Sequence, residues 1–210
     1  MARPREFDIE VAVEQALQVF WSRGYEGAGL IELLEAMQIA RSSLYKTFGD
    51  KRSLFLAALT HYDITRVTAA VSLLRDALIP DGEHRIANLL MSIAEAIEKQ
   101  GDRRGCFLCN TAVDQAPHDK EIAEQVRRMM SRMEEGFFCA LVASNLKRTL
   151  DLNGEGEARL LKTARVLNTV YNGLRVMAKA GYSAGEIRTV IQAQLHQNGL
   201  ENMGLVTKKI

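Results

Sequence analysis

The composition is that of an average soluble globular protein with one or two domains. Of its 210 residues, 47% are hydrophobic and 25% are charged, which excludes a disordered chain. Lys and Arg number 27 against 26 Asp and Glu, so a protein that coats nucleic acids by bulk charge is also excluded, and any such contact needs a local patch. We expect no signal peptide, and the sequence has no apolar run of the roughly 18 residues that cross a bilayer. With three cysteines, an odd number, we expect a reduced cytoplasmic protein without membrane contact.

The first 50 residues predict three short helices. Asp8 can cap the first helix, which carries one apolar face and ends at Gly24. The second follows Gly29 and repeats leucines at helical spacing up to Met37. After a turn at residues 38–40, the third helix covers residues 41–47 and ends before Gly49. Two helices joined by so tight a turn predict a helix-turn-helix.

The rest of the chain predicts longer helices. They cover residues 51–78, about 86–101, 106–115, a long stretch around 122–141, 157–180, and a last helix that a Ser183–Glu186 capping box begins. Residues 153–156 predict a loop. Because no segment alternates like a strand, the fold class is all-α. We expect an N-terminal three-helix helix-turn-helix domain over residues 1–50, joined by a long helix to a C-terminal helical bundle that dimerises over 51–198, and a flexible tail over 199–210.

The third helix offers hydrogen-bond donors that suit DNA. In a helix-turn-helix the second helix of the motif enters the major groove and reads base edges. The exposed side of this one carries no acidic residue, and its donors are Arg41, Ser42, Ser43, Lys46 and Thr47. Lys51 and Arg52 add charge at the next helix N-terminus, where backbone amides also attract phosphate. A helical hairpin that only packs, with solvated lysines, remains the alternative.

Two motifs extend this interpretation to a family. Phe20-x-x-x-Gly24-Tyr25 and Leu44-Tyr45-x-x-Phe48-x-x-Lys51 occur together, and over residues 1–60 the chain resembles the TetR family of transcriptional regulators. The resemblance implies a homodimer that binds a palindromic double-stranded DNA operator and is released by a small molecule. Carried over by position, the resemblance implies two sets of contact residues. Bases or nearby phosphates would be contacted by Arg41, Ser42 and Lys46. Phosphates alone would be contacted by Tyr45, Thr47 and Lys51.

The sequence departs from the family pattern at three positions of the motif. Gly29 and Ala40 stand where the family usually has Ser or Thr as helix caps, and Gln38 stands where it usually has a turn glycine. At Gly29 this removes one expected phosphate contact. Gln38 is expected in a left-handed backbone conformation, a strain of about 1 kcal/mol.

The helix over residues 157–180 carries two apolar stripes, which indicates two partners. One partner can be the core of its own chain and the other a second subunit, although a central helix of a monomer would show the same pattern. The dimer interface is expected to contain Val166, Val170, Gly173 and Met177, completed by Ile187 and Ile191 of the last helix.

Cys106-Phe107-Leu108-Cys109 places two thiols on one helix face. Packing thiols, a redox or electrophile sensor and a metal sensor all fit this spacing, but a zinc site needs further ligands, so we expect no metal. An effector that is largely apolar fits the methionine-rich and aromatic composition of the C-terminal part. Candidate ligand-binding residues are Tyr62, Cys106, Cys109, Asn110, Phe137, Tyr171 and Arg175.

No motif points to catalysis. The sequence has no nucleophile motif and no glycine-rich phosphate loop after a strand, so we expect no enzyme and no cofactor. The prediction is a ligand-responsive transcriptional regulator, and a repressor in particular. Two alternatives stay open: a redox- or electrophile-sensing regulator that acts through Cys106 and Cys109, and a helical protein-binding scaffold without DNA binding.

Overall fold

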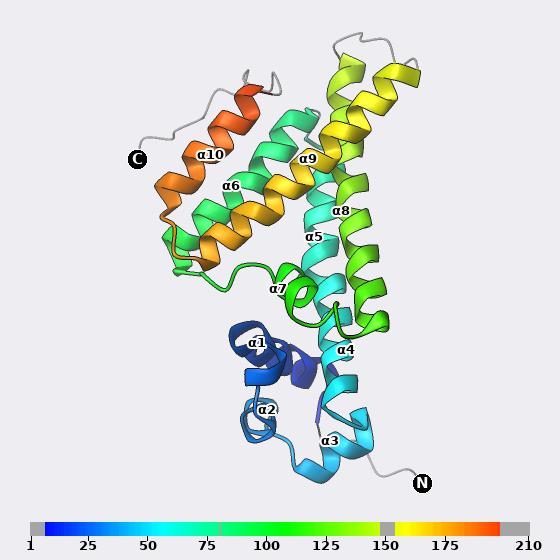
Figure 1. Cartoon of the computed structure of the whole chain (residues 1–210), viewed down its shortest axis with the longest axis vertical. Helices are drawn as coiled ribbons and strands as arrows, with labels where there is room; N and C mark the ends of the chain where they lie inside the picture. Colours follow the sequence, from blue (N-terminus) through cyan, green and yellow to red (C-terminus); the bar gives the residue numbers. More distant parts are fainter. Residues whose placement is uncertain (1–6, 80, 148–153, 198–210) are drawn as a thin grey trace. The chain divides into compact units, whose positions relative to one another are not determined.

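The computed structural model describes residues 7–79, 81–147 and 154–197, and within these ranges it contains helices and no strand (Figure 1). The expected all-α fold is therefore confirmed. Pro80, Asn153 and the predicted tail over 199–210 lie outside the described residues. The helices in chain order are α1 Ile9–Gly27, α2 Leu30–Met37, α3 Arg41–Phe48, α4 Lys51–Tyr62, the π-helix η1 Asp63–Val67, α5 Thr68–Arg75, α6 Gly82–Gln100, α7 Phe107–Asp114, α8 Lys120–Lys147, α9 Gly154–Lys179 and α10 Ala184–Gln197.

Side-chain caps begin several helices, and two of them, Asp8 and the Ser183–Glu186 box, were predicted. The Asp8 carboxylate accepts from the backbone N–H of Glu10 at 2.8 Å, and Asp50 accepts from that of Ser53 at 2.7 Å. Ser183 and Glu186 form the predicted capping box, with reciprocal bonds of 2.8 and 3.2 Å. Each cap satisfies backbone donors that a helix N-terminus leaves without a partner, and so fixes where the helix begins.

The helix predicted over residues 51–78 is interrupted and shorter than expected. A π-helical turn, Asp63–Val67, lies between α4 and α5, and α5 ends at Arg75. Within the turn the backbone N–H and the hydroxyl of Thr68 both bond to the carbonyl of Asp63, five residues earlier, which is the π spacing. α9 begins at Gly154, so residues 154–156, which were expected in a loop, are helical instead.

The chain divides into two compact units. The first contains residues up to Thr68 together with Cys106–Met129, and the second contains Ala69–Gly105 together with residues from Met130 onward. This division differs from the boundary expected at residue 50, because α4 and α7 both pack on α1 and so belong with the helix-turn-helix. The functional boundaries at residues 50 and 198 remain predictions.

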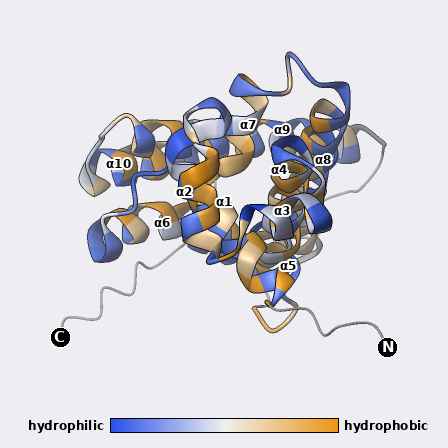
Figure 2. Ribbon diagram, turned by 90° about the horizontal axis from the view of Figure 1, so that it is seen from below, coloured by the Kyte–Doolittle hydropathy of each residue, from blue (hydrophilic) through white to orange (hydrophobic). Residues whose placement is uncertain are grey.

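An aromatic cluster forms the core of the first unit. Ring centroids lie 5.0 Å apart for Phe20 and Phe55, 5.2 Å for Trp21 and Tyr62, and 5.5 Å for Phe55 and Phe107, all in edge-on arrangements that aromatic rings favour. The cluster holds α1, α4 and α7 together. In Figure 2 each of these helices carries both hydrophobic and hydrophilic residues, as expected of helices with one buried face.

In the second unit α6 packs against α9 and α10. Ile187 and Ile191 of α10 are fully buried there, with no exposed side-chain surface. This corrects their expected place in a dimer interface, because their side chains already belong to the core of their own chain.

The start of α6 is tightly packed. The helix begins at the buried Gly82, directly after the Asp81 cap. The Arg85 guanidinium, in the first turn of the helix, donates to the carbonyl of Ile79 at 2.6 Å.

Candidate nucleic-acid interface

The turn between α2 and α3 has the geometry that its unusual residues predict. Gln38 adopts a left-handed conformation with φ 55° and ψ 40°, as expected, and its N–H bonds to the carbonyl of Glu35 at 3.1 Å. Neither Gly29 nor Ala40 caps its helix with a side chain, but both have the extended backbone of a cap residue. The helix-turn-helix therefore keeps its backbone geometry while lacking two side-chain caps.

α3 has one buried and one exposed face. Leu44 is fully buried and Phe48 is half-buried, so they anchor the helix to its unit. The predicted contact residues cover the other face: Ser43 is half-buried, and the exposed ones are Arg41, Ser42, Tyr45, Lys46 and Thr47. Arg41 lies over the Tyr45 ring, with Cζ 5.6 Å from the centroid, which is within cation–π range.

Lys51, in the first turn of α4, contacts the face of an aromatic ring, that of Tyr25. Its Nζ lies 4.7 Å from the centroid of the Tyr25 ring, within cation–π range. Tyr25 is itself wedged against Phe55, with 5.1 Å between ring centroids, and burial raises the pKa of its phenol, so the ring stays neutral at physiological pH. Sequence reasoning predicted Lys51 as a phosphate contact but missed this support; Tyr25 of the Gly24-Tyr25 motif was the available signal.

Arg52 is not a freely exposed cation, in contrast to what its position suggested. Its Nε donates to Asp119 Oδ2 at 2.6 Å, and its Nη2 donates to Asp119 Oδ1 at 3.0 Å and to Glu121 Oε2 at 2.8 Å. The guanidinium holds the pKa of the Asp119 carboxyl below its usual range. Asp119 therefore stays ionised at neutral pH. Sequence reasoning missed this cluster because Arg52 and Asp119 lie 67 positions apart.

Four of the expected ligand-binding residues belong to the first unit. Tyr62, Cys106 and Cys109 are buried, and Asn110 is half-buried. Tyr62 Oη and Cys106 Sγ are 3.4 Å apart, within hydrogen-bond range for sulfur. The structure thus brings Tyr62 and Cys106 together.

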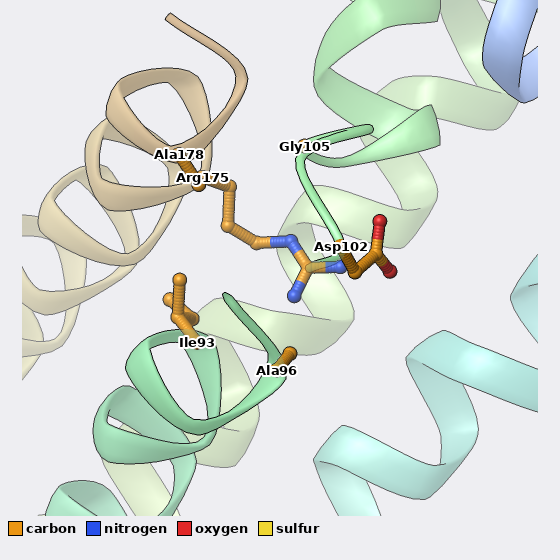
Figure 3. Close-up of a pocket in the computed structure, with 6 residues that line it drawn as sticks. All are labelled: Ile93, Ala96, Asp102, Gly105, Arg175 and Ala178. Atoms are coloured by element: carbon orange, nitrogen blue, oxygen red, sulfur yellow. The ribbon is translucent and has the colours of Figure 1, made fainter. Parts of the chain in front are cut away.

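The other three expected ligand-binding residues belong to the second unit. Ring centroids of Phe137 and Tyr171 are 6.2 Å apart, and Arg175 Cζ lies 5.6 Å from the Tyr171 centroid. Arg175 also borders a small pocket, shown in Figure 3 with the residues that line it: Ile93, Ala96, Asp102, Gly105, Arg175 and Ala178. Its cavity of about 20 Å³ has room for a water molecule, whereas drug-sized ligands occupy roughly 300 Å³ or more.

The outer side of α9 remains open in the single chain. Val166 is 49% exposed, Gly173 is exposed, and Val170 and Met177 are half-buried. This side is distinct from the buried stripe that includes Leu167 and Leu174.

Among the described helices, none has the length and apolar character that crossing a membrane requires.

Comparisons with known proteins agree with this geometry. The sequence model of the family described as bacterial regulatory proteins, tetR family, matches residues 12–58. The chain is 34% identical to the uncharacterized HTH-type transcriptional regulator YezE of Bacillus subtilis (strain 168), over 85% of this chain and 90% of YezE. It is 27% identical to the HTH-type transcriptional repressor ComR of Escherichia coli (strain K12), over 90% of this chain and 87% of ComR.

A solved structure extends the similarity to the whole fold. It is a cysteine mutant of the TetR family transcriptional regulator CifR complexed with 26-base-pair double-strand operator DNA. The two chains superpose with a TM-score of 0.78 at 29% sequence identity, over 92% of this chain and 98% of that one.

Proposed function

The chain belongs to the TetR family of bacterial regulatory proteins and is a transcriptional regulator, and we propose that it is a repressor that binds a palindromic DNA operator as a homodimer. The observation that carries this proposal is the exposed face of α3. Its donors are outside the core, they include no carboxylate, and Arg41 has the fork that pairs with guanine in the major groove. The CifR complex supports it, since a chain of similar fold binds operator DNA.

We assign the dimer contact to the outer side of α9. Val166 and the backbone at Gly173 are exposed in the single chain, although apolar and small residues of this kind are usual at helix–helix contacts. A Cβ added at Gly173 would meet no atom within 4 Å, so the position leaves room for a close approach of a second helix. Two reading helices related by twofold symmetry would lie about 34 Å apart, one turn of DNA.

Replacing Lys51 by alanine tests the phosphate contact. We expect Lys51→Ala to weaken binding to every DNA sequence alike, because the ammonium that Tyr25 supports no longer neutralises a phosphate. A plot of log K against log salt concentration has a negative slope, and its magnitude should decrease by about one for each bound subunit. Fluorescence anisotropy over a salt series measures both effects. Lys99→Ala, which removes an exposed lysine of α6, is the charge-matched control; equal slopes for Lys51→Ala and the control would contradict the contact.

The effector we propose is a largely apolar small molecule that binds in the C-terminal part of the chain. Because the pocket beside Arg175 holds only about 20 Å³, that molecule has to widen it or use another site. Such a ligand releases DNA only if it favours the non-binding conformation, by about 5.5 kcal/mol for a switch from 1:99 to 99:1.

Modification of Cys106 is the second candidate trigger. The thiol is buried at the N-cap of α7, with its Sγ 3.4 Å from the Tyr62 hydroxyl. Because the Tyr62 ring packs on Trp21 in the core of the first unit, a group added to this thiol would disturb that packing. We expect a Cys106→Ser, Cys109→Ser double variant to retain its DNA release by apolar compounds. The measurement is DNA release by a panel of apolar compounds and by oxidants, read by anisotropy. If the double variant loses all response to oxidants and neither protein binds an apolar compound, the thiols carry the signal instead.

A further inference from the structure

Three charged side chains from the two separate segments of the first unit form one cluster at the start of α4. Arg52 lies in the first turn of α4, next to Lys51, while Asp119 and Glu121 flank the start of α8. We call these three residues the ion lock. Asp119 has a second task, because its Oδ1 also accepts from the backbone N–H groups of Glu121 and Ile122 at 3.0 and 3.3 Å. One carboxylate therefore caps α8 and binds α4.

We propose that Asp119 and Glu121 are positioning residues for operator binding: by holding Arg52 they fix the first turn of α4, and the phosphate-binding Lys51 with it, to the start of α8. This inference rests on the proposed operator binding. It gives a role in DNA recognition to two acidic residues that are nearly 70 positions from Lys51 in the sequence.

The geometry favours positioning over a simple surface ion pair. Arg52 meets Asp119 through two parallel bonds, and such fork-shaped pairs fix orientation as well as distance. The Asp119 side chain is only 18% exposed, so solvent screens the pair less than a fully exposed one. About two turns along α4, Gln125 Nε2 donates to Thr60 Oγ1 at 2.9 Å, which joins the same two helices a second time.

A different role for Arg52 predicts a different effect of removing Asp119 or Glu121 on DNA binding. With 42% of its side chain exposed, Arg52 could be a phosphate ligand that the two acids restrain. In that case loss of an acid frees a cation, tightens binding to all DNA and adds about one to the salt slope. If the lock positions α4, loss of an acid instead reduces the preference for the operator over unrelated DNA.

Two conservative variants separate these roles. Asp119→Asn removes the charge but keeps a side chain that caps helices well, and Arg52→Lys keeps the charge but loses the fork. Each is measured by anisotropy on a site selected by the wild-type protein and on the same bases in scrambled order. We expect each to lower the ratio of the two affinities by about tenfold, and the double variant to fall no further, since both remove one interaction.

Glu124→Gln, at an exposed acid of α8 close to Glu121, controls for the change in net charge and should leave the ratio as in the wild type. Unchanged ratios for Asp119→Asn and Arg52→Lys would overturn the proposal, as would tighter binding of Asp119→Asn to both DNAs with a steeper salt slope. Additive losses in the double variant would do so as well. If the wild-type protein selects no site at all, the proposed operator binding fails instead, so the two failures are distinguishable.

Discussion

Gly173→Arg should turn the dimer into monomers and abolish tight operator binding. Gly173 is exposed on α9, and an added Cβ meets no atom within 4 Å, so the single chain can accept the larger side chain. In the proposed dimer the same side chain would place a charge without a partner in an apolar contact, which costs several kcal/mol. Sedimentation velocity should report the mass of one chain, and affinity for a selected palindrome should fall by roughly a hundredfold or more, since two linked contacts become one.

The matched control is Ser92→Arg, which adds the same charge at an exposed position of α6. It should sediment as the wild-type protein does, and both variants should melt within a few degrees of it. A Gly173→Arg protein that keeps the mass of a dimer would show that the outer side of α9 is not the interface.

Gly82→Ala should destabilise the protein by about 3 kcal/mol or more. A Cβ at this buried position would overlap the carbonyl group of Ala140 and lie 2.8 Å from Ser144 Oγ. A backbone carbonyl cannot move aside as a flexible side chain would, so α6 or α8 has to shift within the second unit. Thermal unfolding followed by circular dichroism should show a melting temperature lower by roughly 6–12 °C.

Gly29→Ser provides the contrast for Gly82→Ala. A Cβ at Gly29 meets no atom within 4 Å, and a serine there would supply the side-chain cap that α2 lacks. We expect its melting temperature to equal or slightly exceed that of the wild-type protein. A Gly82→Ala protein that melts within a degree or two of wild type would refute the tight packing of α6 on α8.

Local signals explain why most of the fold was predictable. Asp8, Asp50 and the Ser183–Glu186 pair mark helix starts through bonds to neighbouring backbone groups, and periodicity marks the helices between them. The left-handed conformation of Gln38 was predictable from the family resemblance, because Gln38 stands where the family usually has a turn glycine. The π-helical turn at Asp63–Val67 was not, because its threonine bonds occur equally well in ordinary helices.

Contacts between distant segments account for the rest. An apolar stripe does not reveal which partner covers it, so Ile187 and Ile191 were assigned to a second subunit although they pack in their own chain. The bonds from Arg52 to Asp119 and Glu121 have no sequence signature, because each residue alone looks like a solvated surface charge. On α3, by contrast, the side predicted to be exposed does carry exposed donors, and Leu44 is buried on the other side.

The most direct test of the central claim is to let the purified full-length protein select binding sites from random double-stranded DNA and to sequence what it retains. Operator binding by a symmetric pair of α3 helices predicts a palindrome whose half-sites are centred about 10 base pairs, one helical turn, apart. Selection that enriches no sequence, or only single half-sites without symmetry, would contradict the account.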